Sequence, residues 1–561
     1  MAERLQGLLA ESWSPWAIVL LSLLLALPAL GGGWSADDFV HRLVLNGNQA
    51  FGPRHPLLDL FTFLEPGPWN QALAERGLLP WSSDPETRIS FFRPLSAATH
   101  WLDAFLWPQS APLQHAHSLL WWGLALVGVR WVTKDTGPPW VAALALLLFA
   151  LDDAHAVPIA WLANRNVLIC LTLSLLALGL HQRRKPGWAL LPLALALCAS
   201  EAAIGAVAYI AAWELTRKEV GPKALLRLSP LVLLIGIWRL LYNQAGYGAQ
   251  GGALYVDPVR SPMAFAAASL ERGPILVLGQ WLGLPIEIWM LSDSWVRWSL
   301  ASTGWALCIG LLWALWPLLK ESRQARFWAL GSLGATLPLC AAFPMDRLLL
   351  FPGLGAAALL ALWVQKGGRG ARLMLSLTLV GALVLPLKVW GTNPLMRAAT
   401  QAPLPPTKDP EQPLVFVNGS IFGSFYQLLA PLAQGVSAPE TVALLAPVWT
   451  SLVVYRPQEQ VLEIQAEGGW FELPVDQIAV DPKQLSEGPF YGPGFQADVL
   501  DWTQDHRPLR VRFTFTDIAA PRFLAWQDGA IQDWVLPAVG QTAHLAAGTP
   551  LGRRDAETLS R

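Results

Sequence analysis

Charge is what this sequence has least of. Only 14% of its 561 residues are charged, against roughly 25% in an average soluble protein. The net charge of −1 gives no basic surface for a nucleic acid, so no nucleic-acid partner is expected. Cysteine is also scarce. Its four copies lie inside apolar segments without a Cys-x-x-Cys pair, which excludes a disulfide framework.

Apolar residues take the place of the missing charge: 53% of the chain is hydrophobic, and the mean hydropathy is +0.39. Stretches such as 15–30, 167–180 and 373–386 are almost free of charge. With their flanks they approach the roughly 20 residues that cross about 30 Å of hydrocarbon as a helix. Thirty tryptophans, many at segment ends, suit the membrane interface. The sequence predicts a multi-spanning membrane protein whose first apolar run is a retained span.

Basic residues fall in five clusters between the apolar blocks. The positive-inside rule places such clusters in the cytoplasm, which puts the N-terminus inside and the region after Thr392 outside. Lys388, near the end of the last span, is the one exception. The clusters are Lys134; Arg183 to Lys185; Arg217, Lys218, Lys223 and Arg227; Lys320, Arg323 and Arg326; and Lys366, Arg369 and Arg372.

The predicted fold is a membrane all-α bundle of about eleven transmembrane helices. The block 188–213 has cytoplasmic clusters on both sides, yet its about 26 residues are too few for two crossings. A short helical hairpin with Ser200 and Glu201 at its tip is therefore expected. Two large outer loops are expected, the first from Trp34 to about Leu113 and the second from about Gln244 to Trp298. The apolar stretch 275–291 of the second loop is expected to lie along, or dip into, the outer interface. Expected spans are 16–33, 117–133, 139–155, 163–180, the hairpin 188–213, 224–242, 298–318, 326–343, 347–365 and 373–390.

The composition changes after the last span. Residues 1–391 are expected to form the transmembrane domain, and 392–561 a Pro-rich linker plus a small extracytoplasmic α/β domain. Within it, 414–417 has the composition of a strand and 425–432 helical spacing. Alternation over 509–516 predicts a half-buried strand, and 523–534 with its central Asp-Gly predicts a hairpin.

Two acidic pairs stand where predicted spans reach the outer face. Asp37 and Asp38 follow the first span; adjacent carboxylates repel, which favours a raised pKa and suits a general base. Asp152 and Asp153 close the third span, two residues before His155. A polar helix end is the alternative explanation for each pair. Both pairs, with Glu201 and the Asp346-Arg347 dipeptide, converge on one face, and such convergence is typical of a site.

The arginine and histidine side chains leave alternatives open. Arg93 offers fork-shaped donors that suit a phosphate oxygen, although a lone loop arginine is more often merely solvated. Asp37 and His41 are four residues apart and could share a metal ion, but no metal is expected.

Six short motifs occur in order along residues 15–390. They are Ala36-Asp37-Asp38; Phe92-Arg93-Pro94-Leu95 with Trp107-Pro108 and His117; the stretch from His155 through Trp161 to Arg165; Ser200-Glu201; Tyr255-Val256-Asp257-Pro258; and the stretch from Met345-Asp346-Arg347 to Gly355.

Together these motifs resemble the GT-C superfamily of polytopic glycosyltransferases. The likeness is to the protein O-mannosyltransferases, particularly the transmembrane O-mannosyltransferases with tetratricopeptide repeats. The chain departs from that pattern in three places. Ala199-Ser200-Glu201 stands where the family has Ser-Lys-Glu, so Ser200 replaces the lysine; Asp346 stands where the family has glutamate, and the repeats are missing. The family's protein acceptors are therefore not carried over to this chain.

The resemblance implies an inverting glycosyltransferase in the plasma (inner) membrane, with a polyprenyl-phosphate sugar as donor and an unidentified acceptor. Asp37 would act as the base and Asp38 would orient the acceptor. Neither a cofactor nor a metal is required. Arg93, Arg165 and Arg347 are the candidates for the donor phosphate, and the sugar pocket would contain Asp152, Asp153, His155, Glu201 and Asp346.

Two other functions fit the same residues. A carrier or flippase would bind the lipid-linked sugar without breaking it, although such transporters usually have two related halves and the sequence shows no such symmetry. An assembly subunit without activity is the other alternative.

Overall fold

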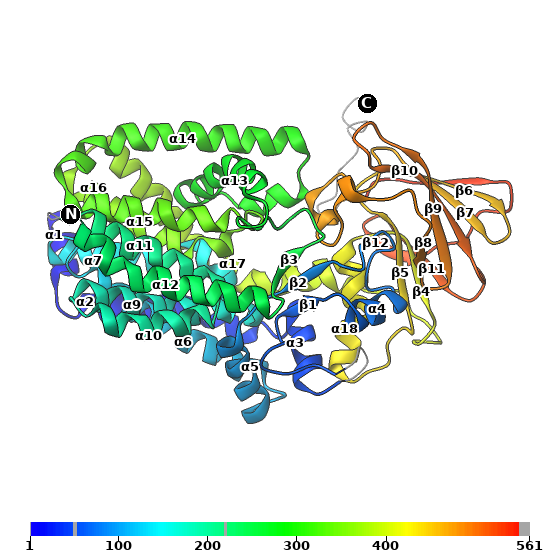
Figure 1. The fold of residues 1–561 in the computed structure, drawn as a ribbon, viewed down its shortest axis with the longest axis horizontal. Helices are drawn as coiled ribbons and strands as arrows, with labels where there is room; N and C mark the ends of the chain where they lie inside the picture. The colour runs from blue at the N-terminus through cyan, green and yellow to red at the C-terminus, as the bar shows by residue number, and fades with distance from the viewer. Residues whose placement is uncertain (1, 49–52, 218–221, 549–561) are drawn as a thin grey trace.

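The computed structural model describes residues 2–48, 53–217 and 222–548. A bundle of helices occupies one end of the molecule and a region of β-sheets the other (Figure 1). Helices α3 (Asp37–Leu45) and α4 (Pro68–Glu75) lie between them, and α5 (Pro94–Leu106) projects from the lower edge of the bundle in this view; all three belong to the predicted first outer loop.

The bundle is built from the apolar blocks of the sequence. Its central helix, α16 (Leu350–Lys366), is buried on every side from Leu350 to Trp363, as expected of an all-apolar helix. The other helices are α1 (Ala2–Ala10), α2 (Ser14–Ala26) continued by the 3₁₀ segment η1 (Leu27–Gly31), α6 (Ala111–Thr133), α7 (Pro139–Ala150), α8 (Ala156–Ala160), α9 (Arg165–Gln182), α10 (Pro186–Leu197), α11 (Ile204–Leu215), α12 (Pro222–Gln244), α13 (Pro262–Leu282), α14 (Ser294–Glu321), α15 (Arg323–Leu339) and α17 (Arg369–Thr400).

The outer helices turn apolar side chains away from the bundle. Trp313 of α14 is 82% exposed and Leu383 of α17 is 76% exposed. Large exposed apolar side chains in such number are costly in water but suit a lipid environment. This chain is a membrane protein.

The predicted count of eleven spans is not confirmed. Within the described residues, five helices are long and apolar enough to cross a membrane, or six if the bent pair 139–150 and 153–160 is one span. Helices α10 and α11 have 12 residues each, about 18 Å at 1.5 Å per residue, which is too short for a crossing. Most of the helices lie where they were predicted, but several are too short to count as spans. The five are Ser14–Gly31, Leu162–Gln182, Leu226–Gln244, Ser294–Glu321 and Arg369–Thr400.

The block 188–213 is broken in the middle, as predicted. Helices α10 and α11 are separated by residues 198–203, and the Ser200 side chain accepts a hydrogen bond from the Ala202 amide there. Glu201 therefore stands at a break between two short helices rather than inside one long helix.

The second outer loop is more helical than expected. Helix α13 begins at Pro262, before the predicted apolar stretch at 275, because Pro262 suits the first turn of a helix. It packs closely against α14: a Cβ at Gly304 would lie 2.3 Å from the Pro274 carbonyl oxygen. The 3₁₀ segment η5 (Ile286–Leu291) follows.

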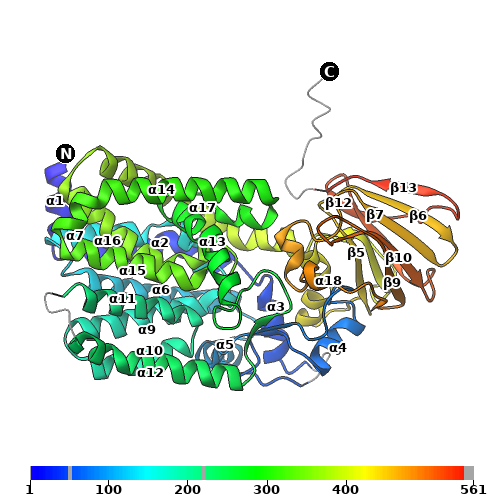
Figure 2. The ribbon, with the colours of Figure 1, turned by 45° about the horizontal axis from the view of Figure 1, so that its top comes forward.

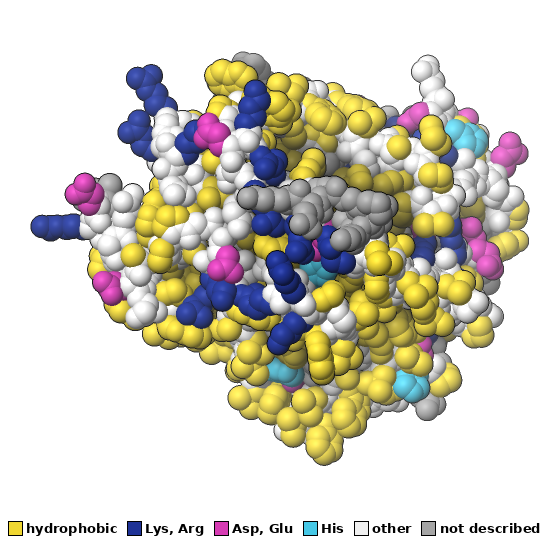
Figure 3. All heavy atoms as spheres, turned by 60° about the vertical axis from the view of Figure 1, so that its left-hand side comes forward, with side chains coloured by type: hydrophobic (Ala, Val, Ile, Leu, Met, Phe, Trp, Pro, Cys, Tyr) yellow, Lys and Arg dark blue, Asp and Glu magenta, His cyan; other side chains and the backbone are white. Residues whose placement is uncertain are grey.

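Basic side chains gather on one face at the bundle end (Figure 3). The loops that carry them meet there: Lys366 pairs with Glu321 at 2.6 Å, and the Arg323 side chain donates to the Thr216 carbonyl at 2.9 Å. These basic clusters therefore share one end of the bundle, as their placement on one side of the membrane requires.

The C-terminal region is formed mainly by two sheets, with one α-helix among its described residues, α18 (Ile421–Gln434). Strand β4 (Leu414–Gly419) lies parallel to both its neighbours, β5 (Val442–Pro447) and β11 (Arg522–Gln527). The predicted strands at 414 and 509 and the hairpin around Asp528-Gly529 are confirmed. The first sheet has the order β12 (Ala530–Asp533), β11 (Arg522–Gln527), β4 (Leu414–Gly419), β5 (Val442–Pro447); the second is antiparallel, with the order β13 (Thr542–Leu545), β6 (Leu452–Gln458), β7 (Val461–Ala466), β10 (Pro508–Phe515), β9 (Phe495–Trp502), β8 (Phe490–Gly492).

The C-terminal region shares a hydrophobic core with the first outer loop. Phe39 and Leu43 of α3 are buried in one cluster with Leu428 and Leu429 of α18. The Val442 amide donates to the Arg76 carbonyl at 2.9 Å. A small sheet of β1 (Thr62–Leu64), β2 (Arg88–Ser90) and β3 (Gly248–Gln250) joins the two outer loops. Apolar packing thus holds α18 directly against α3 (Figure 2).

Candidate functional site

Asp37 is the first residue of α3 and is only half-buried. The residue before it, Ala36, has φ 48°, a strained conformation for a residue with a side chain and one that often accompanies functional sites. Asp37 Oδ1 accepts a hydrogen bond from the Tyr426 hydroxyl at 2.5 Å. Desolvation raises the pKa of Asp37, while the Tyr426 hydrogen bond and the charges of Arg347 and Arg93 lower it in part.

Asp38 has a different environment. It is 3% exposed, and backbone amides occupy both of its oxygens: the Ser35 amide donates to Oδ2 at 2.9 Å and the Ala163 amide to Oδ1 at 2.8 Å. Desolvation raises the pKa of Asp38 to about 8. Its carboxyl group ties α3 to the chain before α9, whereas Asp37 Oδ2 accepts no hydrogen bond from the described residues.

Arg347 lies in the 3₁₀ segment η6 (Asp346–Leu348) and is partly exposed. Its guanidinium carbon lies 5.6 Å from the Trp161 ring and 5.7 Å from the Phe343 ring. It forms no ion pair with any side chain in the described part of the chain. A cation held by aromatic faces, close enough to lower the pKa of Asp37, is available to an anionic ligand.

Arg93 is paired with Glu201. Its Nε and Nη2 donate to Glu201 Oε2 at 3.0 and 2.9 Å, and its guanidinium carbon lies 4.5 Å from the Phe91 ring. Tyr255 contacts Phe91 edge-on at 5.9 Å and Phe343 at 5.5 Å. It therefore bridges the surroundings of Arg93 and Arg347. The structure brings Glu201, Arg93, Arg347 and Asp37 into one region.

Arg165 is placed elsewhere. It is fully buried, and its guanidinium pairs with Asp103 at 2.5 Å. It also donates to the Ser118 hydroxyl at 2.9 Å and to the Gln114 carbonyl at 2.7 Å. Asp103 is shared with His117 at 2.7 Å. The Arg165 charge is compensated internally, and the guanidinium presents no surface to a ligand.

A second charged cluster centres on Lys388 of α17. The Lys388 ammonium lies 2.6 Å from Asp153 and 3.0 Å from Asp346. Glu287 Oε1 accepts the Asp346 amide at 2.8 Å. Lys388 was the exception to the pattern of basic residues, and its partners are the acids predicted for the outer face. Asp346 and Arg347 are adjacent, so η6 contributes one side chain to each charged region.

Asp152 and His155 complete the predicted pocket residues. Asp152 Oδ2 accepts from Gln280 Nε2 at 2.8 Å, beside a pocket that Leu148, Leu360 and Leu377 also line. His155 is buried with its ring 4.5 Å from Phe149 and 5.5 Å from Trp122. It packs as a core residue.

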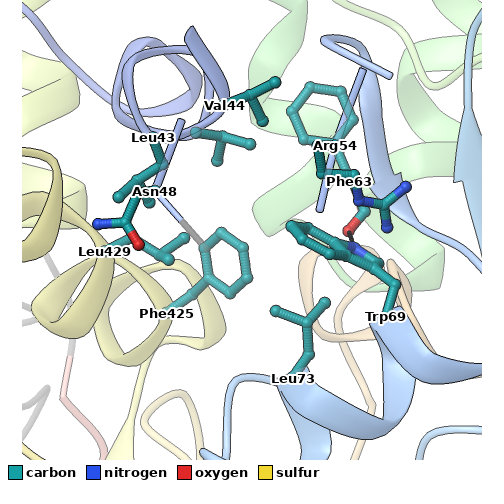
Figure 4. Close-up of a pocket in the computed structure, with 10 residues that line it drawn as sticks. Leu43, Val44, Asn48, Arg54, Phe63, Trp69, Leu73, Phe425 and Leu429 are labelled. Carbon is teal, nitrogen blue, oxygen red and sulfur yellow. Dashed lines mark hydrogen bonds between the residues drawn. The ribbon is translucent and has the colours of Figure 1, made fainter. Parts of the chain in front are cut away.

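An apolar pocket lies along α3 beyond Asp37, between α3, α4 and α18. In Figure 4, Phe425 and Trp69 lie on opposite sides of it, with Leu43 and Val44 on a third. Arg54 covers the Trp69 ring at 3.6 Å and pairs with Glu65 at 2.6 Å. Val40, one turn after Asp37, lines the same pocket, so the pocket and the Asp37 carboxylate share one helix.

Sequence reasoning missed Tyr426 and assigned Lys388 no role. Tyr426 lies 389 residues from Asp37 in the chain, and no local pattern links the two. Lys388 could have been recognised from the sequence, because it was the one exception to the cytoplasmic placement of the basic clusters.

No group of three or more His, Cys, Asp or Glu side chains in the described ranges is arranged to hold a metal ion.

No family model matches the sequence, and no curated protein matches it.

Solved structures of the oligosaccharyltransferase of Archaeoglobus fulgidus are similar at 11% identity: tethered to an acceptor peptide (TM-score 0.36), in complex with Zn and sulfate (0.35) and in the apo form (0.36). They cover 78%, 77% and 77% of this chain, which in turn spans 64%, 62% and 65% of theirs. At such TM-scores the likeness supports no conclusion about this chain.

Proposed function

We propose that this protein is an integral-membrane glycosyltransferase of the GT-C type. It moves a sugar from a polyprenyl-phosphate donor to an acceptor hydroxyl at the outer face of the membrane, with inversion at the anomeric carbon. The observation that carries the proposal is the half-buried Asp37 carboxyl group near Arg347. Among the described residues, Asp37 Oδ2 accepts no hydrogen bond and Arg347 has no ion-pair partner. A base next to a cation is what transfer from a lipid phosphate needs.

In this reaction Asp37 accepts the proton of the acceptor hydroxyl. The hydroxyl oxygen forms a bond to the anomeric carbon as the bond from that carbon to the phosphate oxygen breaks. The phosphate leaves with the electron pair, and Arg347 compensates its charge. A raised pKa makes Asp37 a stronger base than an ordinary aspartate. The scheme uses no cofactor and no metal.

The other charged residues have supporting roles in this proposal. Arg93 is already paired with Glu201, so this pair is assigned to the sugar rather than to the phosphate. Arg165 is buried against Asp103, which assigns it to the scaffold. Asp38 holds the backbone around Asp37 through the Ser35 and Ala163 amides.

The orientation that we propose places the basic end of the bundle in the cytoplasm. With that end in the cytoplasm, the C-terminal region and the Asp37 site lie outside the plasma (inner) membrane. The apolar surfaces of α14 and α17 then face lipid, from which the polyprenyl donor approaches. Reporter fusions in the 183–185 loop and after residue 401 test this arrangement; a cytoplasmic signal after residue 401 contradicts it.

The test of function uses purified protein and a panel of labelled polyprenyl-phosphate sugars, with candidate acceptors. Release of polyprenyl phosphate together with a glycosylated acceptor is expected from the wild type and not from Asp37→Asn. A carrier or flippase would bind the donor or move it across a vesicle membrane without releasing polyprenyl phosphate. That result would replace the transferase proposal.

A further inference from the structure

The contact between Tyr426 and Asp37 joins two parts of the chain that are far apart in sequence. Tyr426 is 3% exposed, and its hydroxyl lies 2.5 Å from Asp37 Oδ1. Burial, followed by the neighbouring Asp37 charge, raises the pKa of Tyr426 well above its ordinary value. The phenol therefore keeps its proton and acts as a donor to the carboxylate.

The helix that carries Tyr426 is held in place independently of this contact. Ser420 caps its first turn through the Gly423 amide, at 3.5 Å. Gln427 Nε2 donates to the Ala402 carbonyl at 2.6 Å, which ties α18 to the chain that leaves α17. The Phe425 ring meets the Tyr426 ring edge-on at 5.0 Å. Together with the apolar packing on α3, the Ser420 cap and the Gln427 hydrogen bond hold α18, and with it Tyr426, beside Asp37.

We propose that Tyr426 is a positioning residue for Asp37, so that the C-terminal region completes the transfer site of the membrane bundle. This inference rests on the proposed function. The hydroxyl holds Oδ1 and limits rotation of the carboxylate, and it leaves Oδ2 to accept the proton of the acceptor. A base held in one orientation avoids the loss of rate that comes with small misplacement of a catalytic group.

The hydrogen bond also favours the ionised form of Asp37 against the effect of burial. Without the hydroxyl, the carboxyl group would hold its proton to a higher pH, so a smaller fraction of it would be ionised and able to accept a proton at neutral pH. Tyr426→Phe removes only the hydroxyl and keeps the ring, so the packing of α18 on α3 is preserved. Tyr455→Phe, on β6 and 38% exposed, is the matched control because it removes a hydroxyl from the same region.

The first measurement needs no substrate. Dicyclohexylcarbodiimide modifies protonated carboxyl groups in apolar surroundings, so the pH dependence of Asp37 labelling in the full-length protein, read by tandem mass spectrometry, reports the pKa of Asp37. In Tyr426→Phe the midpoint is expected to rise by about 1–2 pH units, the effect of losing a hydrogen bond to a charged group. Tyr455→Phe is expected to keep the wild-type midpoint. An unchanged labelling midpoint in Tyr426→Phe overturns the inference. This holds even if the Tm of the variant is lower, because a purely structural role of Tyr426 would lower the Tm without moving the midpoint.

The second measurement is the pH profile of kcat/KM for sugar transfer. Tyr426→Phe is expected to move the acidic limb in the same direction as the labelling midpoint, with KM for the donor unchanged. If the wild type releases no polyprenyl phosphate while the labelling midpoint still shifts, the proposed function fails and the coupling of Tyr426 to Asp37 stands. If the wild type transfers sugar and the midpoint does not shift, only the positioning role fails.

Discussion

Two arginine sites show how differently the same side chain is used in this molecule. Arg165 is fully buried and pairs with Asp103 at 2.5 Å, whereas Arg347 is partly exposed, rests on Trp161 and Phe343, and forms no ion pair within the described residues. A buried charge must be compensated to be tolerated. A charge at a ligand site has to stay available. A charge that is paired inside the protein, such as that of Arg165, supports the fold, whereas an available charge, such as that of Arg347, can bind a ligand. The two aspartates differ in the same way: backbone amides occupy both oxygens of Asp38, and Asp37 keeps one oxygen available.

The largest effect on the rate of sugar transfer is expected from replacing Asp37 and not Asp38. Asp37→Asn keeps the size of the side chain but cannot accept a proton, so transfer should fall by about 10²–10⁴-fold while the labelled donor still binds. Asp38→Asn is the matched variant and should chiefly lower thermal stability, because it disturbs the hydrogen bonds from Ser35 and Ala163. Loss of transfer in Asp38→Asn with near-normal turnover in Asp37→Asn would reverse the assignment.

Arg165→Met should be mainly a stability variant. It leaves the Asp103 carboxylate buried without a guanidinium partner, and breaking a buried ion pair in this way typically costs about 3–5 kcal/mol. Thermal unfolding in detergent would show a lower Tm. The double variant with Asp103→Asn should recover part of the loss, because no uncompensated charge remains. An unchanged Tm with weakened donor binding would return Arg165 to the phosphate role that the sequence motifs implied.

Arg347→Gln should act on binding instead. Losing a charge-assisted partner of the phosphate is expected to raise the Kd of a labelled polyprenyl-phosphate sugar by about 10–100-fold. Arg347→Lys should keep part of the affinity, since it retains the charge but loses the fork of donors. An unaltered Kd in Arg347→Gln would remove this residue from the donor site.

The smallest effect should come from pH alone. Asp37 works as a base only when ionised, and burial raises its pKa above 3.8. As pH falls through that raised pKa, kcat/KM should decrease up to tenfold per pH unit, and activity is retained above it. A profile of kcat/KM that stays flat down to pH 4 would show that Asp37 does not titrate in the step that limits transfer.

Much of the secondary structure could be predicted because its signals are local. The helices α12 and α14 and the strand β10 lie where the hydropathy and the alternation of the sequence indicated. The span count failed because an apolar run shows that a segment is buried, not that it crosses. Helices α10 and α11 are apolar and too short. In the C-terminal region β4, β10 and the hairpin of β11 and β12 were predicted, whereas the other described strands were not. The pairing of the strands into two separate sheets depends on contacts between distant segments.

For the site, the sequence indicated which ionisable residues stand at the ends of the apolar segments, because excluding charge from lipid leaves such side chains at the ends. It thereby marked Asp37, Glu201 and Arg347 as candidates. Which of these charges are compensated internally became visible only in the folded molecule. The Ala163 amide reaches Asp38, Asp103 reaches Arg165, and Tyr426 reaches Asp37 from 389 positions away. A charge is compensated by partners within a few ångströms in space. Hydropathy along the chain does not show which distant residues come that close in the fold.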